Sequence, residues 1–335
     1  MKSGIYIIAE IGQAHEGSLG LAHSYIDALA DTGVDAVKFQ VHIAEAESSV
    51  YESFRTPFSY LNESRMEYWK RMEFTQEQWH KLKKHCEAAG MEFLATPSCV
   101  TAAVLLNDIQ VNKFKVGSGD VTNFLLLKYL ADTGKEIILS SGMSSMEELD
   151  QSVSFLKIKT ENFSLLQCSS SYPTCPEQWG LNLIQELKER YKIPVGFSDH
   201  SGDITACLAA ASLGAEILEF HTVFDQRMFG PDSSSSINID QTSVLVNAVR
   251  KIEKALSNPV SKGITPESIQ LKNIFEKSLA VNKDLSKGHI ISFNDLESKK
   301  PKGKGIAANQ FGNIIGRQLC SDMKKWDFLN ESDLL

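Results

Sequence analysis

Eight short apolar segments recur along the chain, and their alternation with helix-like segments most constrains the fold. They comprise residues 5–12, 36–41, 92–98, 113–117, 136–142, 163–170, 194–200 and 215–224. Their Val/Ile/Leu/Phe character is nearly continuous, which is typical of parallel strands buried on both faces. Eight such strands, each followed by a helix, predict a (β/α)8 TIM barrel. A doubly wound open sheet is the alternative architecture.

Helix signals lie between these segments. The stretches 19–33 and 123–134 have helical character and end at or just before a glycine. The sequences 75-TQEQ and 145-SMEE have the form of capping boxes, in which two side chains satisfy backbone N–H groups at a helix start. These signals support the strand–helix alternation.

Two regions depart from the alternation. Residues 42–74 form a long connection rich in aromatic residues and arginine, which is either a functional lid or partner surface, or an insertion packed on the barrel rim. After a barrel domain at 1–256, residues 257–277 are predicted to be a linker. Residues 278–335 show short β runs broken by turn residues and predict a small β-rich domain. Such a domain is more typical of a cap or an oligomerisation element than of a catalytic unit.

Composition and charge exclude several classes of function. The 335-residue chain has a net charge of −8, which disfavours nucleic acid as a partner because phosphate binding needs a basic face. No run approaches the roughly 18–20 apolar residues of a membrane helix, and the N-terminal apolar stretch is too short for a signal peptide. The six cysteines lack CxxC spacing, which is typical of reduced thiols. We therefore expect a cytoplasmic protein with neither nucleic acid nor membrane as partner.

Polar side chains follow every predicted strand at its C-terminal end. They are Glu10; Lys38 and Gln40; Thr96 and Ser98; Lys115 and Ser118; Ser140 and Ser141; Ser169 to Tyr172; Ser198 to His200; and Glu219 and His221. A solvated loop explains any one strand end taken alone. Active sites of TIM barrels lie at this face, so eight polar strand ends together indicate an active site.

Two lysines in this set indicate an anion site. Lys38 and Lys115 end otherwise apolar strands, where a cation is costly unless an anion compensates it. Hydroxyl groups accompany them at Thr96, Ser118, Ser140, Ser170 and Ser198. The combination suits a phosphate together with a carboxylate. In the alternative interpretation the two lysines pair with Asp120 and Glu10.

Two histidines end consecutive strands. His200 and His221 are expected to be neighbours in a barrel, where they could share a divalent metal with water and substrate oxygens. Spacing alone leaves structural or acid–base roles equally open.

Nine motifs carry a resemblance to a known family. In chain order the sequence contains 9-AEIGQAHEGS, 37-VKFQ, 95-ATPS, 114-FKVGSGD, 138-ILSSGM, 167-QCSSSYPT, 196-GFSDHSG, 219-EFH and 230-GPD. Over nearly its whole length the chain resembles the sialic acid synthases, a group that includes the N-acetylneuraminate, legionaminate and pseudaminate synthases. The terminal segment resembles the antifreeze-like (SAF) domain of these enzymes. In the family this domain reaches across a homodimer and closes the partner's barrel.

The resemblance implies a transferase of carbohydrate biosynthesis. Phosphoenolpyruvate and an open-chain N-acylated hexosamine, N-acetylmannosamine or a related 2-acylamino sugar, would condense to a nine-carbon 2-keto acid. Carbon 3 of phosphoenolpyruvate would attack the sugar aldehyde, water would add at carbon 2, and phosphate would leave by C–O cleavage.

Site roles follow from the same resemblance. By analogy, phosphoenolpyruvate is held by Lys38, Thr96, Lys115, Ser118, Ser140, Ser170 and Ser198. His200 and His221 would bind a metal that polarises the aldehyde, Mn²⁺ first and Mg²⁺ or Co²⁺ as alternatives. Glu10 would position or activate the water. The sugar would contact Gln40, Asp120, Tyr172, Asp232 and Lys300.

Departures from the family pattern fall mainly on the sugar side. Ser170 replaces an asparagine that contacts phosphate, Ala14 precedes His15 where relatives often carry asparagine, and Asp120 replaces a glutamate. In 299-KKPKGKG, Lys300 takes the place of an arginine and lacks its planar fork. A 3-deoxy-heptulosonate-type synthase and a barrel without activity that binds carbohydrate or ice are the competing interpretations.

Overall fold

The computed structural model describes residues 4–55 and 63–335. The chain divides into two compact units, Met1–Pro259 and Val260–Leu335. The first unit holds the eight strands foreseen in the sequence, and the second is the small terminal unit.

The first unit is built on a parallel sheet. Its strands are β1 (Tyr6–Gly12), β2 (Ala36–Val41), β3 (Glu92–Pro97), β4 (Lys113–Val116), β5 (Glu136–Ser140), β6 (Phe163–Cys168), β7 (Val195–Asp199) and β8 (Ile217–Val223). Hydrogen bonding follows the order β3-β2-β1-β8-β7-β6-β5-β4, and the short β9 (Ile237–Asn238) pairs with β8. Strands β3 and β4, at the two ends of this order, contact each other, so the sheet curves into a barrel. The TIM-barrel prediction is confirmed and the open sheet is excluded.

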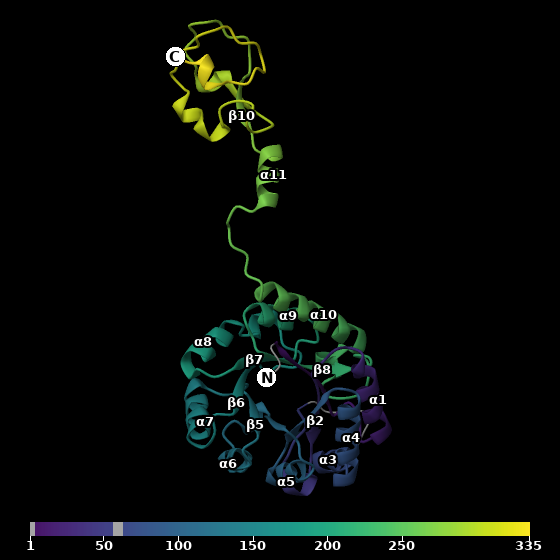
Figure 1. Cartoon of the computed structure of the whole chain (residues 1–335). Coiled ribbons are helices and arrows are strands. Elements are labelled where there is room, and N and C mark those ends of the chain that lie inside the picture. The colour runs from purple at the N-terminus through teal and green to yellow at the C-terminus, as the bar shows by residue number, and fades with distance from the viewer. Residues whose placement is uncertain (1–3, 56–62) are drawn as a thin grey trace. The chain divides into compact units, whose positions relative to one another are not determined.

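Helices surround the barrel (Figure 1). One follows each strand: α1 (Leu19–Ala30), α4 (Gln76–Ala88), α5 (Val100–Asp108), α6 (Phe124–Asp132), α7 (Met146–Lys159), α8 (Asn182–Tyr191), α9 (Thr205–Ser212) and α10 (Ile239–Leu256). The capping boxes foreseen at Thr75 and Ser145 open α4 and α7. Each box satisfies backbone N–H groups that have no partner inside the helix.

The long connection after β2 carries two further helices, α2 (Ala44–Glu47) and α3 (Arg65–Met72). Its described residues form a separate buried cluster from Ala44, Tyr68, Trp69 and Met72. Arg65 lies over the indole of Trp69 at 3.9 Å from the ring centroid. The described part of this connection is thus packed in its own small core.

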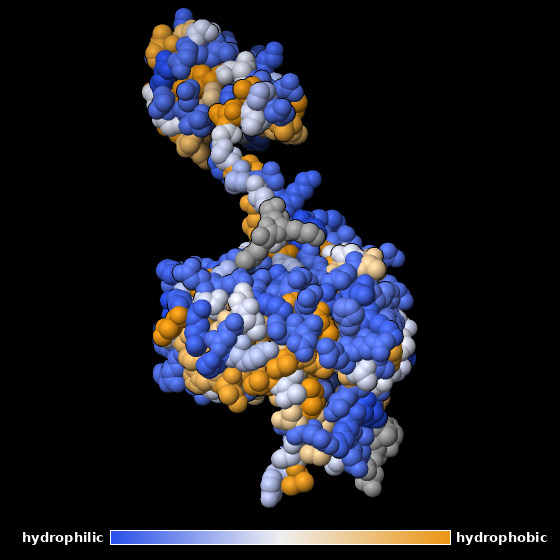
Figure 2. Space-filling view, turned by 60° about the horizontal axis from the view of Figure 1, so that its bottom comes forward, coloured by the Kyte–Doolittle hydropathy of each residue, from blue (hydrophilic) through white to orange (hydrophobic). Residues whose placement is uncertain are grey.

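The second unit has its own core. Strands β10 (Ser278–Val281) and β11 (Leu296–Lys299) form an antiparallel pair, and α11 (Pro266–Phe275) precedes them. The buried apolar residues of this core are Leu279, Val281, Leu285, Ile291, Ile306, Ile314, Leu319, Met323, Leu329 and Leu334. Apolar residues also interrupt its polar surface (Figure 2), with Phe293 and Trp326 among the large exposed ones. Helix α11 lies inside the stretch 257–277, where the sequence predicted only a linker.

Candidate active site

The polar layer of the barrel follows from the alternation of its strands. The barrel floor is formed by the buried apolar residues Ile8, Ala36, Leu94, Ile138, Leu166 and Ile217. Successive side chains of a strand point to opposite faces, so the residue two positions further on faces the same way. Those residues are Glu10, Lys38, Thr96, Ser140, Cys168 and Glu219. The interior of the barrel therefore has an apolar layer and, two residues further along each strand toward its C-terminal end, a mainly polar layer.

Lys38 is the centre of a buried ionic cluster. Its Nζ lies 2.9 Å from Glu10 Oε1 and 3.5 Å from Glu219 Oε1, and it donates to Thr96 Oγ1 at 3.3 Å. Burial alone would raise the pKa of Glu10, but the charges of His221 and Lys38 outweigh burial and hold this pKa well below its usual range. Burial likewise opposes the charge of Lys38, yet the two carboxylates raise its pKa. The pairing of Glu10 with Lys38 therefore favours the charged form of both side chains.

Lys115 is less well compensated than Lys38. It donates to Ser140 Oγ at 2.6 Å and lies 3.6 Å from Glu219 Oε1. Burial lowers the pKa of Lys115, and Glu219 offsets this only in part. Ser198 donates to Glu219 Oε1 at 3.0 Å, while Glu219 Oε2 is buried with no hydrogen-bond partner in the described part of the chain. Of the two buried lysines, Lys115 is therefore the one whose charge a bound anion would compensate most.

The alternative pairing of the lysines is partly wrong. Lys38 does pair with Glu10, but Glu219 is the second carboxylate near both lysines. Asp120 instead accepts a hydrogen bond from Asn123 Nδ2 at 2.9 Å. Its pKa is raised by burial and by the nearby carboxylate of Glu47.

The two histidines lie side by side with ring centroids 5.3 Å apart. His200 Nδ1 faces the carbonyl oxygen of Ser169 at 2.9 Å, and its Nε2 is 3.0 Å from the Tyr172 hydroxyl. A carbonyl partner on one ring nitrogen is the usual second contact of a metal-binding histidine, and the nitrogen that would face the ion, Nε2, is here next to the Tyr172 hydroxyl. His221 Nε2 lies 3.2 Å from Glu10 Oε2.

These residues fit a divalent ion in an open site. Two imidazoles at this separation can share one ion with bonds of roughly 2.1 Å. Among residues 4–55 and 63–335 no group of three or more His, Cys, Asp or Glu is arranged to hold a metal. His200 and His221 would be the nitrogen ligands that the chain offers, with further positions open to water and substrate.

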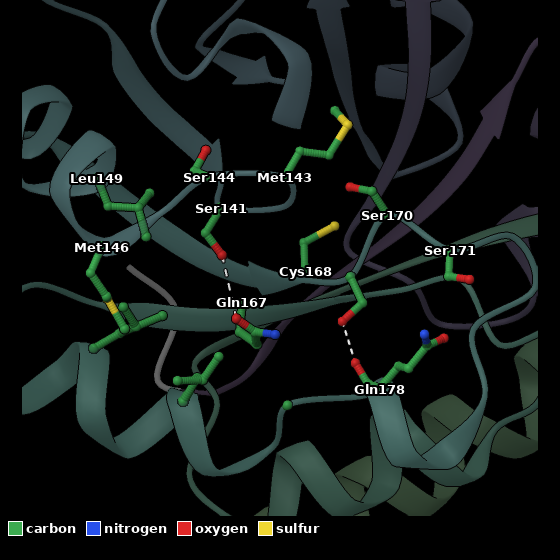
Figure 3. Close-up of a pocket in the computed structure, with 14 residues that line it drawn as sticks. Ser141, Met143, Ser144, Met146, Leu149, Gln167, Cys168, Ser170, Ser171 and Gln178 are labelled. Carbon is green, nitrogen blue, oxygen red and sulfur yellow. Dashed lines mark hydrogen bonds between the residues drawn. The ribbon is translucent and has the colours of Figure 1, made fainter. Parts of the chain in front are cut away.

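Two of the predicted phosphate-binding hydroxyls converge on Gly142. A Cβ at this glycine would lie 2.4 Å from Ser170 Oγ and 2.6 Å from Ser118 Oγ, so only glycine allows both hydroxyls to approach. Next to them lies a cavity of about 470 Å³ that shares Ser170 and Cys168 with the barrel mouth (Figure 3). Its other walls come from the strand ends of β5 and β6 and from α7 and α8. It therefore lies between barrel and helices rather than on the barrel axis.

Amide groups join the ionic cluster to the long connection after β2. Gln40 donates from Nε2 to Glu10 Oε1 at 2.7 Å and accepts from Gln13 Nε2 at 2.6 Å. His42 continues the inward-facing row of β2, and its Nε2 is 3.4 Å from the Gln40 oxygen. Glu47 lies 2.7 Å from His42 Nδ1, and Trp69 stacks on the imidazole at 3.7 Å between centroids.

A second group from the connection covers Tyr172. The guanidinium of Arg55 lies 3.9 Å from the centroid of the Tyr172 ring. It also donates to Asp232 Oδ1 at 2.6 Å and to the Pro231 carbonyl at 3.1 Å. The predicted sugar-binding residues Tyr172 and Asp232 are therefore joined through Arg55.

Most of the predicted site residues come together in the first unit. Direct contacts link Glu10, Lys38, Gln40, Thr96, Lys115, Ser140, Ser198, Tyr172, His200 and His221 into local groups at the barrel mouth. Lys300 belongs to the second unit, where its Nζ lies 4.7 Å from the ring centroid of Phe275. Its approach to a sugar stays a prediction.

Several residues of the site had no role in the sequence interpretation. Glu219 was named among the polar strand ends but given no specific role, although it precedes His221 by two positions and so shares its face of β8. Glu47 and Arg55 were not foreseen, because Glu47 ends the four-residue helix α2 and Arg55 lies outside helices and strands, so neither belongs to a stretch long enough to show periodicity.

Comparison with known proteins identifies the class. The NeuB family profile matches residues 25–261. A relative from Campylobacter jejuni, named N,N'-diacetyllegionaminic acid synthase, is 34% identical over 97% of this chain and 98% of its own length. The human N-acetylneuraminate-9-phosphate synthase is 32% identical over 97% of this chain and 91% of its own length.

A solved structure agrees with these relatives. The crystal structure of N-acetylneuraminic acid (sialic acid) synthetase from Leptospira borgpetersenii, in complex with citrate, is 33% identical with a TM-score of 0.71. The match covers 81% of this chain and 91% of that chain. The chain belongs to the NeuB family, and the resemblance inferred from the motifs is confirmed.

One further expectation concerns membranes. Within the described residues, every helix is too short or too polar to cross a bilayer.

Proposed function

We propose that this protein is a transferase that condenses phosphoenolpyruvate with an N-acylated hexosamine to a nine-carbon 2-keto acid. A new bond forms between carbon 3 of phosphoenolpyruvate and the aldehyde carbon. Water adds at carbon 2, and the C–O bond to phosphate then breaks. The observation that carries this proposal is the buried cluster of Lys38, Lys115, Glu10 and Glu219 among hydroxyls at the barrel mouth.

The donor is assigned to the lysine side of the mouth. Burial lowers the pKa of Lys115, and the carboxylates of Glu219 and Glu10 offset this only in part, while Lys38 lies near the same oxygen of Glu219 as Lys115 does. Phosphoenolpyruvate carries both a carboxylate and a phosphate, so it can engage both cations. The remaining contacts are proposed for Thr96, Ser118, Ser140, Ser170 and Ser198. The cavity beside Ser170, lined by serine hydroxyls and by methionine and leucine side chains, offers room for the departing phosphate.

Glu10 is proposed to orient the water. Its carboxylate pKa lies far below neutral pH, so it is a weak proton acceptor but a good hydrogen-bond acceptor. In that role it fixes the water beside carbon 2 without first losing its pairing with Lys38.

His200 and His221 are proposed to hold a divalent ion, Mn²⁺ first among the candidates. Such an ion acts as a Lewis acid toward a carbonyl oxygen. The chain's own contribution is the fixed orientation of the two imidazoles, which Ser169 and Glu10 maintain.

The acceptor sugar is proposed to lie on the side of Gln40, Asp120, Tyr172 and Asp232. These side chains offer amide, carboxylate and hydroxyl groups of the kind that bind sugar hydroxyls. The relatives differ in whether the named product carries a phosphate: the human protein is named for a 9-phosphate product and the Campylobacter protein is not.

Assembly is part of the proposal. We propose a domain organisation of barrel at 1–256, connecting segment at 257–277 and antifreeze-like domain at 278–335, in a homodimer where each terminal domain closes the partner's barrel. Lys300 would then act in trans. Mixing Lys38→Met with Lys300→Ala subunits should restore activity, because one site of each mixed dimer is intact. No recovery after verified subunit exchange would disprove the sharing of sites.

The direct test is phosphate release. Purified protein with Mn²⁺ and phosphoenolpyruvate should release phosphate only when a suitable N-acyl hexosamine is present, and mass spectrometry should find the nine-carbon acid. Erythrose 4-phosphate serves as a comparison acceptor for the heptulosonate-type alternative. Turnover with erythrose 4-phosphate but with no N-acyl hexosamine would favour the heptulosonate-type synthase instead. Absence of phosphate release with every acceptor would refute the proposal.

A further inference from the structure

A chain of hydrogen bonds connects Glu10, in the ionic cluster, with Glu47, in the connection after β2. Three side chains link them in order: Gln40 next to Glu10, then Gln13, then His42 next to Glu47. Glu10, Gln13 and His42 are buried, and the side chain of Glu47 is only 8% exposed. The proposed reaction makes no use of Gln13, His42 or Glu47. Any effect that they have on it must therefore pass along this chain.

The two ends of the chain fix the direction of the hydrogen bonds within it. An ionised carboxylate accepts hydrogen bonds and donates none. At one end, Gln40 therefore presents its NH2 group to Glu10 at 2.7 Å, and its oxygen faces the other way. At the other end, His42 presents Nδ1–H to Glu47 at 2.7 Å, which leaves a lone pair on Nε2 of the neutral ring.

Gln13 lies between the two halves of the chain and satisfies both. Its Nε2 is 2.6 Å from the Gln40 oxygen and 3.4 Å from His42 Nε2, so the two N–H groups of one amide serve two acceptors. The Gln40 oxygen is also 3.4 Å from His42 Nε2, but both atoms are acceptors in this arrangement and do not bond. The hydroxyl of Tyr68 donates to the Gln13 oxygen at 3.5 Å, which favours the same orientation of the amide.

Packing within the connection after β2 holds the far end of the chain in place. The indole of Trp69 stacks on the His42 ring with 3.7 Å between centroids. Trp69 belongs to the buried cluster of α2 and α3, and its Nε1 donates to Glu52 at 3.2 Å. Because the indole is fixed in this way, the imidazole keeps its orientation and each of its nitrogens keeps its partner.

We propose that Gln13, His42 and Glu47 are positioning residues that hold the Gln40 amide with its NH2 group on Glu10. A glutamine amide can turn by half a rotation with little change of shape, because its oxygen and nitrogen are nearly equal in size. In the turned state the Gln40 oxygen would face the Glu10 carboxylate and repel it. The chain excludes that state, so Glu10 keeps the place from which it is proposed to orient the water. This inference rests on the proposed function and adds to it residues that act through Gln40.

The first test replaces Gln13 by Met, which keeps the length of the side chain and removes both N–H groups. With saturating N-acyl hexosamine, kcat should fall about tenfold, because Gln40 can then turn and a misplaced catalytic group lowers the rate steeply. Affinity for phosphoenolpyruvate by calorimetry should stay within about twofold, since the charge-assisted contacts of the lysines are untouched. The number of binding sites per chain from the same titration counts the folded protein, so a misfolded fraction cannot imitate the result.

Thr242→Val is the matched control. Thr242 is buried between β8 and the outer helix α10, and its hydroxyl also has two partners, Thr222 Oγ1 at 3.2 Å and the Asn238 carbonyl at 2.9 Å. Loss of these hydrogen bonds should lower the melting temperature. Both kcat and the affinity for phosphoenolpyruvate should stay as in the wild-type protein.

A double-mutant cycle tests whether the chain acts in sequence. The variant His42→Phe/Glu47→Leu removes the far end and replaces both partners by apolar groups, while the new ring can still stack on Trp69. Alone it should lower kcat about threefold, the effect of one weak hydrogen bond. Combined with Gln13→Met it should lower kcat no further, because the far end acts on Gln40 through Gln13.

Each other outcome decides the matter. Unchanged kcat in Gln13→Met, with turnover by the wild-type protein established, overturns the positioning role while the proposed function stands. Equal losses of kcat and of phosphoenolpyruvate affinity mean that Gln13 supports the barrel mouth in general, which also overturns it. Independent, multiplying effects in the cycle overturn the part of His42 and Glu47. Absence of turnover by the wild-type protein with every acceptor refutes the proposed function itself, and the inference with it.

Discussion

The two sides of the barrel mouth are built in different ways. The donor side consists of strand residues, and its charges compensate one another in a buried cluster of Lys38, Lys115, Glu10 and Glu219. The acceptor side consists largely of groups from the connections after strands, and its charges form separate pairs, of which His42–Glu47 is buried and Arg55–Asp232 lies nearer the surface. The side chain of Arg55, for example, is 44% exposed.

This difference bears on how freely the residues of each side can be substituted. A residue on the donor side cannot change without leaving a buried charge unpaired, which typically costs about 3–5 kcal/mol. A residue in a connection can change at far lower cost. We infer that the donor is set by the barrel and the acceptor by the segments around it.

The largest loss of turnover is expected for the two histidines proposed to bind the metal. His200→Ala or His221→Ala should lower turnover by at least about 1,000-fold, because each removes one of only two protein ligands proposed for the metal. His80→Ala, on the outer helix α4, is the control and should keep wild-type activity. Full activity of chelator-treated protein, checked by metal analysis, would contradict the metal role.

The donor side can be tested at Lys115. Lys115→Met should weaken phosphoenolpyruvate binding at least tenfold by calorimetry, because a desolvated charge-assisted contact is lost. The variant should also unfold more easily, since Glu219 loses one of its two lysine partners. The double variant Lys115→Met/Glu219→Gln should regain stability but not binding.

Lys113→Met provides the matched control for this test. Lys113 lies on the same strand at the opposite end of the barrel and pairs with Glu136 at 2.8 Å. It should bind phosphoenolpyruvate like wild-type protein. Equal weakening in both variants would mean that binding responds to general damage of β4 and not to the loss of a specific contact.

The sequence predicts that the residues of the buried cluster lie together, and the reason is physical. Buried parallel strands have continuous apolar runs, and the period of two places every second residue on one face. Polar residues that interrupt such runs, as Lys38 and Lys115 do, must therefore lie inside the barrel. The same rule applied to Glu219, two positions before His221, would have completed the cluster.

The acceptor side was predicted only in part. Tyr172 and Asp232 were inferred from family motifs, while their partner Arg55 comes from a segment distant in sequence. No periodicity relates Glu47 to His42, because the short helix α2 places it by tertiary packing. Helix α11 was missed although its sequence contains a start signal, because Thr265 caps it and Pro266 stands at its first position; none of its residues is buried.

An intermediate effect is expected at Tyr172. Tyr172→Phe removes the hydroxyl that faces His200 Nε2 at 3.0 Å and keeps the ring under Arg55. The KM for the acceptor should rise about three- to tenfold, the usual range for one hydrogen bond, with unchanged donor affinity. Tyr191→Phe, which removes a hydroxyl bonded to Asp150 on the outer surface, should leave both values unchanged. Weaker binding of phosphoenolpyruvate by Tyr172→Phe would contradict the assignment of donor and acceptor to separate sides of the mouth.

The smallest effect concerns stability at Asp199. This residue follows Ser198 on β7, so its side chain points away from the mouth. It accepts hydrogen bonds from Ser201 N and Oγ at 3.1 and 2.8 Å. Burial raises its pKa from 3.8 to about 6, although the Ser201 hydrogen bonds oppose the shift. At neutral pH the folded protein therefore holds an ionised carboxylate that the unfolded chain would solvate better.

Asp199→Asn should consequently stabilise the protein, and the stabilisation should be larger at high pH than at low pH. Because the folded pKa lies above the unfolded value, the cost of the carboxylate is complete above pH 6 and falls as protonation of the folded state begins. The gain should reach at most about 3 kcal/mol at pH 8 and decrease by about half at pH 5. Thermal unfolding at both pH values measures it, with the exposed Asp108→Asn as a control that should show no such trend. A variant that is less stable at pH 8 than at pH 5, relative to wild type, would mean that the Ser201 hydrogen bonds outweigh burial and that this carboxylate supports the strand end next to His200.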